Sequence, residues 1–337
     1  MRHIACFAFA LALAVCFFAE AFAQQTKVQA PGKMVDIGGY KLYVDCRGKG
    51  SPTVVLDYGG GDVSTVWSLV QPEIARYTHV CSVDRSYDGF SDAGPIPTSL
   101  HQQAFELRLL LQTEHIAPPY VLVGHSIGGL MDQVYKSLYS DEIGGMVLVD
   151  STDVDTALGD KSLRNSATGR AIPPAHSMAG ESLPAYTPEQ QQLIANYNRI
   201  LAQEAKSPLQ GNLAKLPSDI QPLWRLEHSH FTLVPGDPPQ VWWAEEAALL
   251  YRERQEKEHL YGDMPLVVLA GQSAIADPGR LREVNNLATL STDVRLLIAP
   301  QSGHRMQLDV PWLVNQSVQD VVTALRQHKT LENLSER

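Results

Sequence analysis

A serine flanked by glycines is the residue of this sequence best placed to do chemistry. It is Ser126, the middle residue of the pentapeptide Gly-His-Ser-Ile-Gly that starts at position 124. A short apolar run of strand type precedes the pentapeptide, and a helix-like stretch follows it. A strand-to-helix corner holds a serine in a strained backbone conformation, with its hydroxyl beyond the carboxyl edge of the sheet. The pattern therefore predicts a nucleophile, and a Gly-Ser turn without chemistry is the alternative.

A serine hydroxyl needs a base to take its proton, and His304 is the histidine whose position suits that role. It lies in the loop after the last predicted strand, and that loop opens on the same edge of the sheet as Ser126. His125 adjoins the serine, so we expect its side chain to point away. His228 and His230 could suggest a metal pair, but no further Cys, Asp or Glu cluster supports one, and we predict no metal. A structural histidine is the alternative for His304.

Two aspartates between the serine and the histidine could hold the imidazole in its working tautomer. Asp150 directly follows a predicted strand, and Asp277 lies in the loop after the next one. Asp277 is followed by Pro278, and an aspartate before a proline is typical of a helix N-cap with proline at the first helical position. Since capping alone would explain those two residues, we expect Asp150 to be the acid and keep Asp277 as the alternative.

An oxyanion that forms on the substrate needs N–H donors. The N–H of Ile127, directly after the serine, is one candidate. Three glycines follow the predicted strand at 53–57, and they allow the backbone to approach a substrate carbonyl closely. We expect Gly60, in the middle of this run, to supply the second donor; a flexible turn is the alternative.

The elements that must position these residues alternate between strand and helix. Short apolar or β-branched runs have the composition of buried parallel strands. They are residues 53–57, 79–83, 120–123, 146–149, 266–269 and 294–298. Helical stretches lie between them, so the sequence predicts an α/β sheet covered on both faces. The alternation breaks over residues 151–262, where we expect a mainly helical cap inserted between a core of residues 24–150 and 263–337.

The first 23 residues have the pattern of a secretory signal. A positively charged start precedes an apolar run at 4–18, and Ala-Phe-Ala at 21–23 supplies a cleavage site with small residues. The run is short for a bilayer span, so we predict a cleaved signal peptide, a secreted or periplasmic protein and no stable membrane insertion.

The formal net charge of −10 gives no general attraction for nucleic acid, and we expect no nucleic-acid partner.

Two cysteines, Cys46 and Cys81, remain after the signal is removed. An even pair in an exported chain favours a disulfide, and two buried thiols are the alternative. Each cysteine lies in a strand-like run, so the bridge can close if those two strands are neighbours.

These ordered features resemble the α/β-hydrolase family over about residues 33–326. They comprise the Tyr-Gly-Gly-Gly turn at 58–61, Asp84-Arg85 after the next strand, the serine corner, an insertion where such enzymes carry a helical lid, and Gly303-His304. The resemblance implies a mostly parallel sheet of about eight strands with a cap domain and no cofactor. It also implies that the second strand, antiparallel, lies beside the fourth, which would place Cys46 near Cys81.

Three positions depart from the family pattern. Tyr58 stands where relatives usually have histidine, which leaves the backbone donor intact. Ala274 stands where many relatives place the acid, and this moves the acid to Asp150 or Asp277. Tyr87 stands where a glycine is common, so the shape of that loop is left open.

The sequence thus predicts a serine hydrolase that cleaves a small-molecule carboxylic ester through Ser126, His304 and Asp150, with an acyl-enzyme intermediate. Hydrolysis of amides, thioesters or carbon–carbon bonds uses the same machinery and stays open. A binding protein that keeps the fold without turnover is the alternative from another class, and the missing acid at position 274 is its best support.

Overall fold

The computed structural model describes residues 29–95, 98–157, 206–230 and 239–334, with a few single helical positions between 188 and 203. The fold considered below belongs to the unit Gly32–Arg337. The predicted signal peptide, residues 1–23, lies outside the described residues. Within the described part of the chain, no helix combines the length and apolar character needed to cross a membrane.

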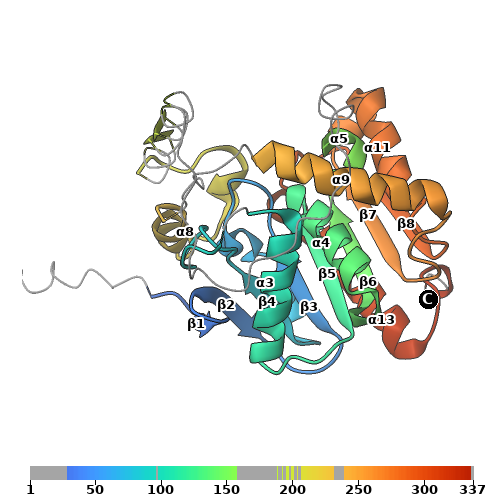
Figure 1. Ribbon diagram of the computed structural model, residues 1–337, viewed down its shortest axis with the longest axis horizontal. Coiled ribbons are helices and arrows are strands. Elements are labelled where there is room, and N and C mark those ends of the chain that lie inside the picture. The colour runs from blue at the N-terminus through green and yellow to red at the C-terminus, as the bar shows by residue number, and fades with distance from the viewer. Residues whose placement is uncertain are drawn as a thin grey trace, which may run out of the picture. The chain divides into compact units, whose positions relative to one another are not determined.

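An eight-stranded sheet forms the centre of the molecule, in the order β1-β2-β4-β3-β5-β6-β7-β8 (Figure 1). The strands are β1 (Lys33–Asp36), β2 (Lys41–Arg47), β3 (Thr53–Asp57), β4 (Val80–Val83), β5 (Tyr120–His125), β6 (Ile143–Val149), β7 (Leu266–Ala270) and β8 (Val294–Ile298). Strand β2 pairs antiparallel with both β1 and β4, and all other pairs are parallel. The predicted mostly parallel α/β sheet is therefore confirmed.

Helices cover both faces of this sheet because its central strands carry buried apolar side chains on both faces. In β5, Val121 and Val123 face one hydrophobic cluster, and Tyr120 and Leu122 face the other. The first cluster is covered by η1 (Ser64–Trp67), α2 (Gln71–Ile74) and α13 (Pro311–Gln327). The second is covered by α3 (Leu100–Thr113), α4 (Ile127–Leu138), α9 (Pro239–Glu256) and α11 (Pro278–Ala288).

The described part of the insertion is helical and is held on the core by two buried carboxyl groups. Glu227, on α8 (Gln221–His228), accepts hydrogen bonds from the hydroxyls of Ser64, at 2.6 Å, and Thr65. Glu246, on α9, accepts the backbone N–H of Leu100 at 2.6 Å, at the start of α3. Burial raises the pKa of Glu246 to about 7. Figure 1 shows α9 crossing α4, with which it is in contact.

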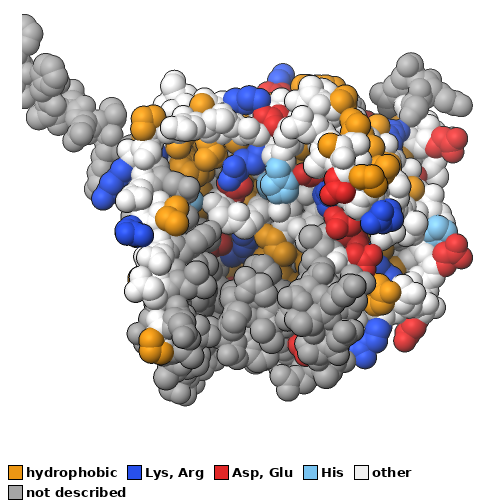
Figure 2. Space-filling view, turned by 90° about the horizontal axis from the view of Figure 1, so that it is seen from above, with side chains coloured by type: hydrophobic (Ala, Val, Ile, Leu, Met, Phe, Trp, Pro, Cys, Tyr) orange, Lys and Arg blue, Asp and Glu red, His pale blue; other side chains and the backbone are white. Residues whose placement is uncertain are grey.

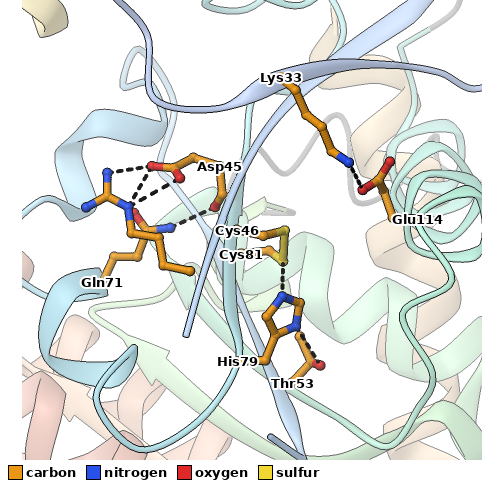
Figure 3. Close-up of a disulfide and its surroundings, with 9 residues drawn as sticks. Lys33, Asp45, Cys46, Thr53, Gln71, His79, Cys81 and Glu114 are labelled. Atoms are coloured by element: carbon orange, nitrogen blue, oxygen red, sulfur yellow. Dashed lines mark hydrogen bonds and ion pairs between the residues drawn. A yellow bond between two sulfur atoms is a disulfide. The ribbon is translucent and has the colours of Figure 1, made fainter. Parts of the chain in front are cut away.

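A disulfide joins the antiparallel strands β2 and β4 (Figure 3). Cys46 and Cys81 lie directly opposite each other in the register of this pair, with their Cα atoms 4.1 Å apart. The predicted bridge is thus present in the structure. The sequence separation of 35 residues means that the bond closes a loop containing β3 and η1.

Replacing both cysteines by serine is expected to lower the free energy of unfolding by about 3 to 4 kcal/mol, because the bond restricts the unfolded chain over this loop. Urea unfolding of the wild type and the Cys46→Ser/Cys81→Ser variant measures the difference. The wild type treated with a dithiol reductant is the control and should match the variant. Equal midpoints for oxidised wild type and variant would contradict the prediction.

Candidate active site

Ser126 occupies the corner between β5 and α4 with a backbone conformation that non-glycine residues rarely adopt. Its φ is 55° and its ψ is −124°. The strain is held by backbone hydrogen bonds, since Ser126 N–H donates to the carbonyl of Val149 at 3.2 Å and its own carbonyl accepts from Thr152 N–H at 2.9 Å. The serine is therefore fixed at the carboxyl ends of β5 and β6, as the strand-to-helix pattern predicts.

The glycines on either side of the serine are required by close backbone approach. A Cβ atom at Gly124 would lie 2.4 Å from the Cα of Gly129. A Cβ atom at Gly128 would lie 2.5 Å from the carbonyl oxygen of Tyr58. Contacts this short are not tolerated, so side chains at these positions would displace the corner from the sheet.

The glycine run after β3 lies against the serine corner. A Cβ added to Gly59 would be 2.9 Å from the Cβ of Ser126, and one added to Gly60 would be 3.7 Å from Cγ2 of Ile127. Ile127 is the first residue of α4, where an N–H has no carbonyl of its own helix to bind. The structure thus places the two predicted donor residues, Gly60 and Ile127, next to each other at the serine corner.

Arg85 fixes the shape of this glycine loop. Its guanidinium donates to the carbonyls of Tyr58 at 2.8 Å and Gly59 at 3.3 Å. It also lies 3.8 Å from the centre of the Tyr58 ring and pairs with the carboxylate of Asp57. Tyr58 is therefore buried beneath Arg85, and the same arginine holds the backbone of the loop through the carbonyls of Tyr58 and Gly59.

His304 is hydrogen-bonded to Asp150. Its Nδ1–H donates to Oδ2 of the carboxylate at 2.6 Å, so Nε2 is left for another partner. The imidazole is 58% exposed and the carboxylate only 3%. In the space-filling view from above, histidine, basic, acidic and hydrophobic side chains lie close together near the middle of the face (Figure 2). Burial by itself raises the pKa of Asp150, but the hydrogen bond from His304 and the charge of Arg280 outweigh it, and the pKa lies below its ordinary value.

Asp277 has a different place in the structure. It is exposed, and its Oδ1 accepts the N–H of Gly279 at 2.8 Å. It is the N-cap of α11, with Pro278 at the first helical position. The residue is thus the helix cap that its sequence context indicates, and the carboxylate on His304 comes from Asp150.

His125 contacts both the ring and the backbone of His304, and the sequence does not predict this contact. The two rings lie 4.6 Å apart, and His125 Nε2–H donates to the backbone carbonyl of His304 at 2.9 Å. Gln307 donates to the other ring nitrogen at 3.2 Å. Burial and the neighbouring His304 lower the pKa of His125 to about 3, so this buried ring stays neutral. The sequence predicts that this ring points away from Ser126 but does not predict its contact with the His304 loop; its position directly before the serine is the one signal.

An ion pair joins the loop after β3 to the loop of His304. Arg305 Nε donates to both carboxylate oxygens of Asp62, at 3.1 and 3.0 Å. The Asp62 side chain is 2% exposed. Because Asp62 follows the glycine run and Arg305 follows the histidine, the pair connects the proposed oxyanion donors to the proposed base. Nothing in the local sequence of either residue indicates the partner.

Arg305→Gln is expected to lower the free energy of unfolding by about 3 kcal/mol, because it leaves the buried carboxylate of Asp62 without its cation. The Asp62→Asn/Arg305→Gln double variant removes both charges and should recover part of that loss. Urea unfolding of the wild type, both single variants and the double variant completes the cycle. A single Arg305→Gln variant as stable as the wild type would show that the pair is not needed.

The two histidines considered as a metal pair do not converge on one site. His228 is stacked on Trp224 with ring centres 4.3 Å apart, and His230 faces Phe90 at 5.7 Å. Within the described ranges, one group of three candidate ligands lies together, Cys46, His79 and Cys81. Both sulfurs of that group are joined in the disulfide.

Comparison with known proteins identifies a family whose model matches most of the chain. Residues 54–315 match the model of a family described as the alpha/beta hydrolase family. The chain is 28% identical over 149 residues to an uncharacterized vacuolar membrane protein of Saccharomyces cerevisiae, which covers 39% of this chain and 23% of that protein. It is 24% identical over 315 residues to the dihydrolipoyllysine-residue acetyltransferase component of the acetoin cleaving system of Pseudomonas putida, covering 93% and 74%.

Among solved structures, the chain resembles a thermophilic esterase from Thermogutta terrifontis with a TM-score of 0.55. The two are 18% identical, and the match covers 87% of this chain and 99% of the esterase, so it shows the fold. The family model spans most of the chain and the sheet order agrees with it. The chain therefore belongs to the alpha/beta hydrolase family.

Proposed function

We propose that this protein is a serine hydrolase that cleaves a small-molecule carboxylic ester. The observation that carries the proposal is the 2.6 Å hydrogen bond between His304 Nδ1 and Asp150, in a loop that contacts His125 beside the strained Ser126. The esterase from Thermogutta terrifontis shares the fold. Hydrolysis of amides, thioesters or carbon–carbon bonds uses the same three side chains, so the ester is the most specific part of the proposal.

In the proposed reaction, Ser126 Oγ attacks the ester carbonyl carbon and passes its proton to Nε2 of His304. Asp150 stabilises the positive charge that forms on the imidazole. The N–H groups of Ile127 and Gly60 bind the oxyanion of the tetrahedral intermediate. When the carbon–oxygen bond breaks, His304 returns the proton to the leaving alcohol, and the acyl group stays on the serine.

Water then completes the cycle. His304 takes a proton from a water molecule, which attacks the acyl carbon and forms a second tetrahedral intermediate. Collapse of this intermediate breaks the bond to Ser126, which regains the proton from His304. The products are a carboxylic acid and an alcohol, and no cofactor takes part in this scheme.

Labelling with a fluorophosphonate tests the proposal directly. We expect one label per folded chain, located on Ser126 by peptide mass spectrometry. A panel of p-nitrophenyl esters, the matching anilides and thioesters then separates ester hydrolysis from the other reactions. If the folded protein takes no label and cleaves p-nitrophenyl acetate no faster than its Ser126→Ala variant, it is a binding protein with a hydrolase fold.

We propose that the chain is exported and that its first 23 residues are removed. The signal pattern and the Cys46–Cys81 disulfide, a bond typical of oxidising compartments, support this. The mass of the protein recovered from the medium or periplasm of its native host should correspond to a chain that begins at Gln24. A chain that keeps Met1 and is found with the cytosolic fraction would contradict the proposal.

A further inference from the structure

The carboxylate of Asp150 has a second partner besides the histidine. Arg280 Nη2 donates to Oδ1 at 3.1 Å, while His304 binds Oδ2. The same Nη2 donates to the backbone carbonyl of Ser151 at 2.9 Å. The Arg280 side chain is 15% exposed. The N–H of Gly271 also donates to Oδ1, at 3.4 Å. The buried carboxylate is therefore held between the imidazole on Oδ2 and the guanidinium and a backbone N–H on Oδ1.

The first turn of α11 delivers Arg280 to this place. Asp277 caps the helix, Pro278 starts it and Arg280 follows two residues later. On the next turn, Glu283 accepts Arg280 Nη1 at 3.0 Å and fixes the direction of the side chain. Asp277, the alternative candidate for the acid, thus affects the site only indirectly, by capping the helix that carries Arg280.

We propose that Arg280 is a positioning residue that offsets the charge of Asp150, so that His304 remains unprotonated, and able to act as a base, further into the acid pH range. The inference rests on the proposed function. An arginine is cationic throughout the working pH range, so this charge is permanent. Without it, the uncompensated carboxylate would favour the protonated form of the imidazole, which cannot take the proton of Ser126.

Several other charged or titratable groups face this pair. Glu283 lies on the same helix as Arg280, His125 is on β5, and Arg305 and Asp62 lie on the far side of His304. His125 is neutral, and the Asp62–Arg305 pair carries no net charge. Asp309, which accepts the N–H of Gly303, is paired with Lys215. Among these described groups, Arg280 contacts Asp150 directly and Glu283 pairs with Arg280, so their charges act in opposite directions.

The pH profile of kcat/KM for an ester substrate tests this, since its acid limb reports the base of the free enzyme. Arg280→Gln should move the acid limb to higher pH by about one unit, lowering the rate about tenfold below the limb and little above it. Arg280→Lys should restore most of the wild-type profile. Arg282→Gln, an exposed position on the same helix, is the matched control and should leave the profile unchanged.

Glu283→Gln is the second variant, and it should move the limb the other way, to lower pH. A profile of Arg280→Gln that superposes on the wild type, or that drops by the same factor at every pH, overturns the inference. If Arg280→Gln does not fold, the direction of the Glu283→Gln shift decides.

Titration of the His304 ring by NMR, assigned with a His304→Ala variant, needs no substrate and separates the two proposals. If the wild type hydrolyses no ester but the titration moves with Arg280, the proposed function fails and the inference stands. If the wild type is an active esterase and the His304 titration is the same in the Arg280 and Glu283 variants as in the wild type, the inference alone fails.

Discussion

Replacing Ser126 or His304 by alanine is expected to lower kcat for an ester by about a million-fold while the protein stays folded. In the proposed reaction the serine oxygen forms the covalent intermediate, and without the imidazole that oxygen is not a nucleophile at neutral pH. Because the two groups act as a unit, the Ser126→Ala/His304→Ala double variant should be no slower than either single variant. Hydrolysis of a p-nitrophenyl ester, measured with highly purified protein, gives these rates.

The control for this prediction is Ser140→Ala. Ser140 is an exposed serine just beyond the C-terminal end of α4, whereas Ser126 precedes its N-terminal end. It should keep the full wild-type rate, and urea curves should show that all the variants are folded. A Ser126→Ala variant that retains more than about a thousandth of the activity would assign the chemistry to another group.

Asp150→Asn is expected to lower kcat by about ten thousand-fold. An asparagine has the same shape, but it cannot stabilise a charged imidazole, and its amide group favours the wrong tautomer of His304. The matched control is Asp277→Asn, the same chemical change at the competing aspartate. Asparagine caps helices about as well as aspartate, so this variant should keep both its stability and its rate.

These two variants, measured side by side for rate and for urea midpoint, distinguish the two candidate acids. A large loss of rate in Asp277→Asn, together with a small loss in Asp150→Asn, would reverse the assignment. Equal small losses would point away from a triad and toward a serine and histidine that work without a carboxylate.

Much of the fold can be predicted from short stretches of sequence, because buried strands and helix caps depend on residues close together in the chain. The apolar runs that become β3, β5, β6 and β7 are buried on both faces, and such strands can be recognised without knowledge of their neighbours. The cap at Asp277 depends on one hydrogen bond to a residue two positions away. The sequence does not predict strand β1, because only Val35 of its four residues is buried and the edge position leaves little periodicity.

The supports of the candidate site could not be predicted in the same way. His125 meets the carbonyl of His304, Arg305 meets Asp62 and Arg280 meets Asp150, each across more than a hundred residues of chain. Each contact depends on the sheet order and on the exact lengths of the loops, and neither is encoded near the residue concerned. The roles of Ser126, His304, Asp150, Ile127 and Gly60 stay predictions until the variants are measured.

The pairing of distant residues has a consequence for how the protein comes into being. During synthesis the corner that carries Ser126 emerges early, whereas His304 and Arg305 emerge only after β8. His304 follows its partner His125 by 179 positions, and Arg305 follows its partner Asp62 by 243. A ribosome-bound or prematurely terminated polypeptide that lacks this last segment contains Ser126 but not His304, its proposed base. If the proposed function holds, we expect no ester hydrolysis from incomplete chains, and activity only after the final strand has joined the sheet.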